Sequence, residues 1–155
     1  MTDRLSYDED TAFTLADDAA TVSALVRRTG PARLHSQRFG EWSALQVLAH
    51  VTEAAEVFAE RVRRCIEEDG PAIAGWDQDA AMAALDDASL DAMALSRRLL
   101  RAHQSIVQAM QRPGARERTG VHAEWGRVPA AHFAAYQARH SHEHVSELAA
   151  AFPPV

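Results

Sequence analysis

Apolar residues recur along most of the chain at the three- and four-residue spacing of amphipathic helices, and no stretch keeps the alternation typical of strands. Alanine, the residue with the highest helix propensity, is abundant. The pattern is interrupted by glycine–proline or proline–glycine pairs at 30–31, 70–71 and 113–114, which are typical ends of helices. We therefore predict four helical segments joined by three connections.

The first predicted helix begins at Ser6 and Glu9, which have the spacing of a capping box, and continues to Gly30. In a capping box, the side chain of the capping residue bonds to the backbone N–H of the third helical residue, and the side chain of that residue bonds to the backbone N–H of the capping residue. This arrangement marks the start of a helix. The apolar stripe predicted to face the core consists of Phe13, Ala16, Ala20, Val22, Leu25 and Val26.

The second predicted helix has the clearest start in the sequence. Ser43 and Gln46 form a second capping box, and Trp42 and Val47 occupy the two positions of a hydrophobic staple around it. The helix is expected to end at Gly70. Its apolar stripe consists of Val47, Val51, Ala54, Phe58, Val62, Cys65 and Ile66.

The third predicted helix begins between Asp79 and Ser89 and ends at Pro113, while the fourth begins near Pro129 and ends before Pro153. Four helices of about 20 to 30 residues, each about 30 to 45 Å long, can share one core. We predict one all-α domain over residues 1–155, a four-helix bundle. Three connections join the helices, 31–42, 70–80 and 113–128. They contain or adjoin the three tryptophans, Trp42, Trp76 and Trp125, and are expected to cover one end of the bundle.

The 155-residue chain carries a formal net charge of -6 and contains no lysine, so all 16 basic residues are arginine. Lysine Schiff-base chemistry and a P-loop lysine are therefore excluded. An acidic chain without a long basic run also does not favour nucleic-acid binding. Small molecules are the expected partners.

Cys65 is the single cysteine, which excludes an intramolecular disulfide and a multi-thiolate metal site. This is compatible with a reducing compartment. The N-terminal segment MTDRLSYDED is acidic and lacks the pattern of a signal peptide. No apolar run reaches the roughly 18 residues that a membrane span requires. We expect a cytoplasmic protein without a membrane segment.

Three of the eight histidines form a candidate metal site. His140 and His144 are four residues apart, so a helix places both on one face, and the apolar residues around them put that face inward. His142 is about 200° from His140 around the helix and should point elsewhere. His50 lies on or next to the apolar stripe of the second helix. Buried imidazoles need partners, and a shared cation would supply one.

Two segments of the chain resemble the DinB/YfiT-like superfamily. WSALQVLAHVTEAAEVFAERV (42–62) resembles the second helix of that family, with a histidine seven residues after the Trp-Ser pair, and HAEWGRVPAAHFAAYQARHSHEHVSEL (122–148) resembles its last loop and helix. The resemblance implies a bundle with up-down-down-up connectivity and a divalent metal held by three histidines. At the matching positions these are His50, His140 and His144. Ser141 departs from the pattern, which often has a non-ligating Asp there.

The resemblance also implies a function. Characterised members of the superfamily activate low-molecular-weight thiols such as bacillithiol or mycothiol, and others look like metal-dependent hydrolases. We expect a thiol S-transferase first, a metal-dependent hydrolase second, and a metal- or ligand-binding stress-response module without turnover third. The implied cofactors are a divalent metal, with zinc ahead of nickel, iron and manganese, and a low-molecular-weight thiol. The family often dimerises, and alanine-rich helices allow a homodimer.

Other side chains are weaker candidates. Glu53 and Glu56 follow His50 and could orient ligands or act as a base, or they could belong to a solvated face. A di-iron carboxylate centre would need inward glutamates on all four helices, which this arrangement does not match. Cys65, about 22 Å beyond His50 along the helix, is expected to be a core residue. His122 and Trp125 could border a pocket. The remaining histidines have no partner visible in the sequence: His35, His103 and His132.

Overall fold

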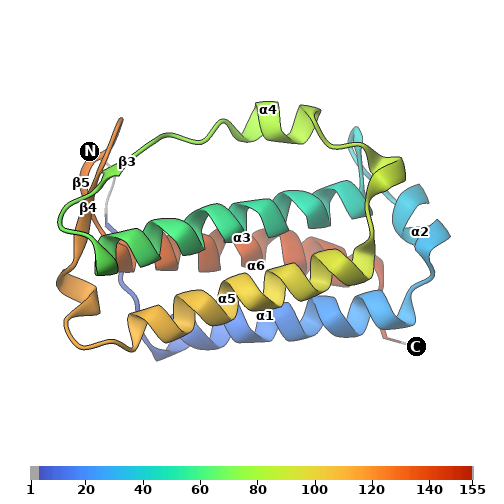
Figure 1. Cartoon of the computed structure of the whole chain (residues 1–155). Coiled ribbons are helices and arrows are strands. Elements are labelled where there is room, and N and C mark those ends of the chain that lie inside the picture. The colour runs from blue at the N-terminus through green and yellow to red at the C-terminus, as the bar shows by residue number, and fades with distance from the viewer. Residues whose placement is uncertain (1–3, 155) are drawn as a thin grey trace.

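The computed structural model describes residues 4–154, and four long helices run alongside one another through it (Figure 1). They are α1 (Glu9–Arg28), α3 (Ala44–Glu67), α5 (Ala92–Met110) and α6 (Ala130–Ala151). The four-helix bundle is therefore confirmed. Residues 1–3 and 155, which the single-domain prediction includes, lie outside the described residues, and that prediction stays a prediction. Within residues 4–154, no helix has both the length and the hydropathy that crossing a membrane requires.

The helices follow an up-down-down-up order, as predicted. In Figure 1, α3 and α5 both start at the end where α1 finishes, so these two consecutive long helices run parallel. This requires the connection between them to return along the whole bundle, through β3 (Ala72–Ile73), α4 (Gln78–Ala83) and a 3-10 turn, η1 (Asp87–Ser89). Each of α3 and α1 packs against both α5 and α6. The long connection thus lies over α3, which α4 contacts.

The start of α1 differs from the prediction. Asp8, not Ser6, caps the helix, and it forms a reciprocal capping box with Thr11 instead of Glu9. The predicted inward stripe is also partly wrong, because the side chain of Phe13 is 68% exposed and Ala16 and Ala20 face solvent. Alanine is compatible with either face, so it gives little information about which face is buried. The residues that α1 buries are Leu15, Asp18, Ala19, Val22, Leu25 and Val26.

The start of α3 agrees with the prediction. Ser43 Oγ accepts the Gln46 N–H at 3.0 Å, and Gln46 Oε1 accepts the Ser43 N–H at 2.8 Å, which completes the capping box. Trp42 packs against the apolar cluster that contains Val47, as a staple requires. All seven residues of the predicted stripe are buried. The helix ends at Glu67, three residues before Gly70.

The ends of the other two long helices, α5 and α6, lie closer to the predicted ends. α5 begins at Ala92, later than predicted, because Asp91 caps it and accepts the N–H groups of Met93 and Ala94. The preceding residues form α4 and η1 instead. α6 begins at Ala130, directly after Pro129, and ends at Ala151, as predicted.

Short strands in the connections are the feature that the all-α prediction missed. β1 (Arg38–Phe39) pairs with β2 (Trp42–Ser43), next to the short helix α2 (Pro31–Ser36). At the opposite end, β4 (Thr119–His122) pairs with β3 in parallel and with β5 (Gly126–Pro129) antiparallel; η2 (Ala115–Glu117) precedes it. The expectation that the connections cover one end is wrong, because they cover both ends (Figure 1).

The capping interactions of Ser43 yield a first prediction. Ser43 Oγ also donates a hydrogen bond to Asp87, which His35 contacts from α2, so one hydroxyl joins the start of α3 to the long connection. Replacing Ser43 by Ala should lower the free energy of unfolding by about 1 to 2 kcal/mol. Urea unfolding measures this. Ser146→Ala, on the exposed face of α6, is the matched control, and an equal loss in both variants would contradict the role of the cap.

Candidate metal centre

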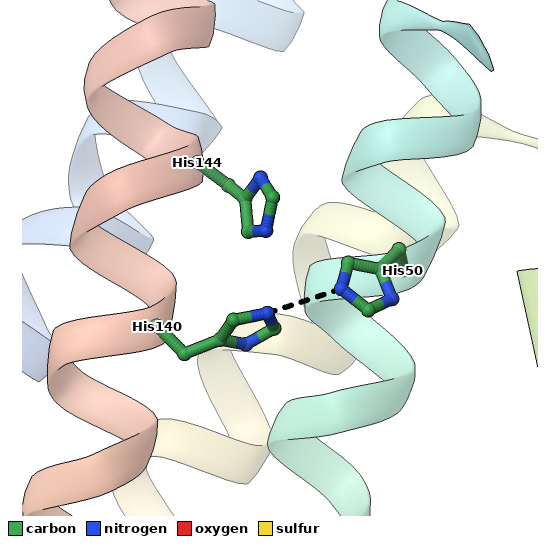
Figure 2. A group of neighbouring side chains, drawn as sticks. All are labelled: His50, His140 and His144. Carbon is green, nitrogen blue, oxygen red and sulfur yellow. Dashed lines mark hydrogen bonds between the residues drawn. The ribbon is translucent and has the colours of Figure 1, made fainter. Parts of the chain in front are cut away.

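Three histidine side chains from two helices converge inside the bundle (Figure 2). His50 comes from the second turn of α3, and His140 and His144 come from consecutive turns of α6. Each offers a ring nitrogen, and these nitrogens all lie within 4.8 Å of one another. The Nε2 atoms of His50 and His140 are 3.0 Å apart. The structure therefore brings together the three residues selected from the sequence.

The environment of His50 and His140 favours neutral imidazoles. Burial lowers the pKa of His50, and the neighbouring His144 lowers it further. Burial also lowers the pKa of His140, to about 4, with His144 and His50 contributing. A neutral imidazole keeps a lone pair available for a cation. The second nitrogens of two rings are unusual, since Nδ1 of His50 and of His140 are buried without a hydrogen-bond partner among the described residues.

Aromatic rings orient the histidines where hydrogen bonds do not. Trp76, from the long connection, lies parallel to the His50 ring at a centroid distance of 6.2 Å. Tyr136, one turn before His140 on α6, stacks on that ring at 6.5 Å. Metal-binding histidines usually donate their second N–H to an oxygen that fixes the ring. In this site, packing against two aromatic side chains takes that role.

The three side chains fit a divalent cation. Nitrogens bound to a tetrahedral zinc ion at about 2.0 to 2.1 Å are about 3.3 Å apart. The separations here, from 3.0 Å up to at most 4.8 Å, need only small ring movements to match. Among residues 4–154, no cysteine or carboxylate joins the group. Three protein ligands would leave an open coordination position, as in catalytic rather than structural zinc sites.

His142 points away from the group, as predicted. Its side chain is largely exposed, and its Nδ1 is 3.1 Å from the carboxylate of Asp18 on α1. Ser141 donates a hydrogen bond of 3.0 Å to the other oxygen of Asp18. Asp18 is buried, and this burial raises its pKa although both hydrogen bonds oppose the shift. A carboxylate from α1 therefore lies beside Ser141, the position where the family pattern often has Asp.

The acidic and thiol candidates do not join the histidines. Glu56 forms an exposed ion pair with Arg98 of α5, with oxygen–nitrogen distances of 2.6 and 3.1 Å. Glu53 is half-buried, which raises its pKa, but it lies outside the histidine group. Cys65 is fully buried, which raises its pKa to about 11 and makes it a core residue without a reactive thiolate. A Cβ on Gly120 would lie 2.9 Å from its sulfur.

A small cavity adjoins the histidines, and both loop residues expected to border a pocket line it. His122 and Trp125 face it from β4 and the turn that follows. Sequence reasoning missed Arg61, which also lines it. Arg61 follows His50 by eleven residues, or about 20° around α3, so the helical period could have identified it. The remaining lining residues are Phe58, Gly75, Trp76, Gln78, Glu124 and Tyr136.

The other histidines have structural contacts. His35 contacts Asp87, and His132 Nδ1 accepts the Leu5 N–H at 2.9 Å. His103 is buried between three helices, where its Nδ1 contacts the Leu15 carbonyl at 2.7 Å and its Nε2 contacts the Gln137 amide at 3.1 Å. The neutral ring satisfies both contacts by carrying its proton on Nδ1.

Comparison with known proteins agrees with the fold. A model of the DinB superfamily matches residues 14–148. Among solved structures, the chain is similar to YfiT from Bacillus subtilis, with 19% sequence identity and a TM-score of 0.76 over 97% of this chain and 93% of that one. YfiT is described as a probable metal-dependent hydrolase with an unusual four-helix bundle topology. No curated protein matches the chain.

The burial of His103 predicts a pH dependence of stability. Burial lowers its pKa from an ordinary 6.5 to about 4, so between these values the unfolded chain takes up a proton that the folded chain does not. The free energy of unfolding should therefore fall as pH drops from 6.5 to 4, by about 3 kcal/mol from this residue. NMR titration of the ring and urea unfolding at pH 7 and 4.5 test this. His103→Asn should reduce the dependence; a ring titrating near 6.5 would contradict it.

Metal loading tests the candidate site directly. Replacing His50, His140 or His144 by Ala should weaken zinc binding by more than about 100-fold, because residues outside the ligand set typically change it by about 10- to 100-fold or less. His142→Ala is the matched control and should load as the unaltered protein does. Metal content is measured on untagged proteins exposed to equal zinc. Equal loading of His140→Ala and His142→Ala would refute the assignment.

Proposed function

Because the chain belongs to the DinB superfamily, we propose that it is a divalent-metal-dependent enzyme whose ion is held by His50, His140 and His144. The observation that carries this proposal is the convergence of three inward imidazoles, two of them with lowered pKa values, from two helices. Hydrogen bonding within the group accounts for one nitrogen pair only. A cation accounts for all three rings at once.

The chemistry follows from an open position on such an ion. When bound, a divalent cation lowers the pKa of an acid at that position, which gives a nucleophile near neutral pH. The protein's own part is to hold and shield the site. The three histidines bind as neutral rings, Trp76 and Tyr136 fix two of these rings and exclude water from one side, and the adjoining cavity receives part of the substrate.

We propose thiol S-transfer as the reaction. The chain offers no thiolate of its own, because Cys65 is buried in the core, so a low-molecular-weight thiol would bring the sulfur. That thiol loses its proton to the surrounding water, and its sulfur forms a bond to an electrophilic carbon whose leaving group departs with the electrons of the broken bond. No carboxylate of residues 4–154 joins the histidines as a base, which favours a nucleophile that needs only ionisation. Zinc is the first metal to test, followed by nickel, iron and manganese.

Hydrolysis is the second candidate. It is favoured by the description of YfiT as a probable metal-dependent hydrolase, a protein with the same fold over nearly the whole chain. In that case water would be the acid that ionises, and an ester or amide bond would break. A hydrolase needs a base near that water, and the carboxylate on the cavity wall is that of Glu124, an exposed residue of the β4–β5 turn.

Turnover assays on metal-loaded protein distinguish the two reactions. With zinc, a low-molecular-weight thiol and an aromatic electrophile, we expect thioether formation that depends on metal and thiol. His140→Ala should lower kcat/KM by at least about 100-fold, since it removes a proposed ligand, whereas His142→Ala should retain the activity. Ester or amide cleavage without any thiol requirement would favour the hydrolase. Equal activity of the two variants would contradict a metal-dependent reaction at this site.

A further inference from the structure

The cavity beside the histidines is lined by an arginine that has no acidic partner among residues 4–154. The volume of this cavity is about 90 Å³. Trp76 and Tyr136 form the wall between the cavity and the histidine group, since each lines the cavity and stacks on a histidine. A water molecule in liquid occupies about 30 Å³, so the space matches one carboxylate or phosphate group. A group bound there is separated from the histidine group by these two aromatic rings.

Arg61 is a buried cation with one hydrogen bond. Its residue exposure is 7%, and Nη2 donates to the Ala74 carbonyl at 2.9 Å. Its guanidinium also lies over the ring of Phe58 at 4.9 Å. No carboxylate lies within ion-pair distance of it among residues 4–154, although buried charges are usually paired. Burial lowers the pKa of Arg61, because the charged guanidinium is less favourable away from water.

His122 supplies a second donor in the wall of the same cavity. Its Nδ1 accepts the backbone N–H groups of Glu124 and Trp125, both at 3.1 Å. The neutral ring must therefore carry its proton on Nε2, which has no hydrogen-bond partner in the described part of the chain. The residue is only 5% exposed and lines the cavity together with Arg61. Two nearly buried side chains thus offer N–H groups that no acceptor in the described part of the chain occupies.

Glu124, the carboxylate on the cavity wall, forms no ion pair with Arg61 or His122. Glu124 lies on the exposed turn after β4, and its Oε1 approaches Gly75 rather than Arg61. Arg4 does not line the cavity and donates to the carbonyls of Trp125 and Arg127. Of the charged side chains that line the cavity, the buried one is therefore the Arg61 cation, which suits an anion.

We propose that Arg61 and His122 bind the carboxylate or phosphate group of an anionic small molecule whose reactive end reaches the histidine group. The proposal rests on the proposed function in taking this molecule to be the thiol or its electrophile. The Cα atoms of His50 and Arg61 are about 16 Å apart along α3, and the guanidinium leans back over Phe58 toward His50. The ligand is accordingly shorter than about 16 Å from its anionic group to its reacting atom.

Anion binding can be measured on metal-free protein by tryptophan fluorescence, because Trp76 and Trp125 line the cavity. Inorganic phosphate and acetate are titrated separately at constant ionic strength, with chloride as reference. We expect saturable binding of at least one of them, and the stronger of the two identifies the class of anionic group. Arg61→Gln should weaken it by about 10- to 100-fold, and Arg61→Lys by less, because lysine keeps the charge but not the planar fork.

Two variants control for folding and for general charge. Arg63→Gln removes an exposed arginine of the same helix, paired with Glu67, and should bind anions as the unaltered protein does. His122→Asn keeps an acceptor for the Glu124 and Trp125 N–H groups but removes the donor in the cavity wall, so it should weaken binding without disturbing the turn. Helix content by circular dichroism verifies that each variant is folded.

The outcomes separate this proposal from the proposed function. Non-saturable responses, or equal affinities in Arg61→Gln, His122→Asn and Arg63→Gln, would overturn the anion site. That result leaves the metal assignment untouched, because no metal or turnover enters the titration. Conversely, saturable binding that both cavity variants lose supports the site even if thiol transfer is not observed.

Discussion

The register between α3 and α6 is the constraint on which the rest of the site depends. The Ser43 cap fixes the start of α3, and His50 follows seven residues later on the face that packs against α6. On α6, the two facing histidines are four residues apart and lie between an apolar cluster with Phe133 and Ala138 and another with Val145 and Leu148. A shift of either helix by one residue would rotate its donors by about 100° and separate the rings.

Burial explains why these histidines suit a cation and why, without one, they lower the stability of the fold. The surrounding apolar side chains disfavour imidazolium, so the pKa of His140 falls to about 4 and its lone pair stays available. The same surroundings leave two Nδ1 atoms without hydrogen-bond partners among residues 4–154, and unpaired buried polar atoms are rare in native proteins. The parallel course of α3 and α5 contributes too. It sends the long connection back over α3 and places Trp76 on His50.

Much of the bundle could be predicted from periodicity and punctuation, but not the parts that depend on distant contacts. The Ser43 box, the α3 stripe and the histidine spacing on α6 are local signals, and the structure agrees with them. The buried face of α1 was misjudged because alanine fits either side of a helix. The strands of two to four residues form only when connections far apart in sequence meet. The sequence could also place Arg61 near the face of His50. It could not show that Arg61 has no acidic partner among residues 4–154, because that depends on contacts between distant segments.

X-ray absorption spectroscopy of the zinc-loaded protein tests the central claim, a three-histidine ion with an open position, most directly. The account predicts three imidazole nitrogens at about 2.0 to 2.1 Å and one or two further light ligands. Addition of a low-molecular-weight thiol should replace a light ligand by one sulfur at about 2.3 Å, with the three imidazoles unchanged. Fewer than three imidazoles, or a carboxylate or protein sulfur in the ligand set before thiol is added, would contradict it.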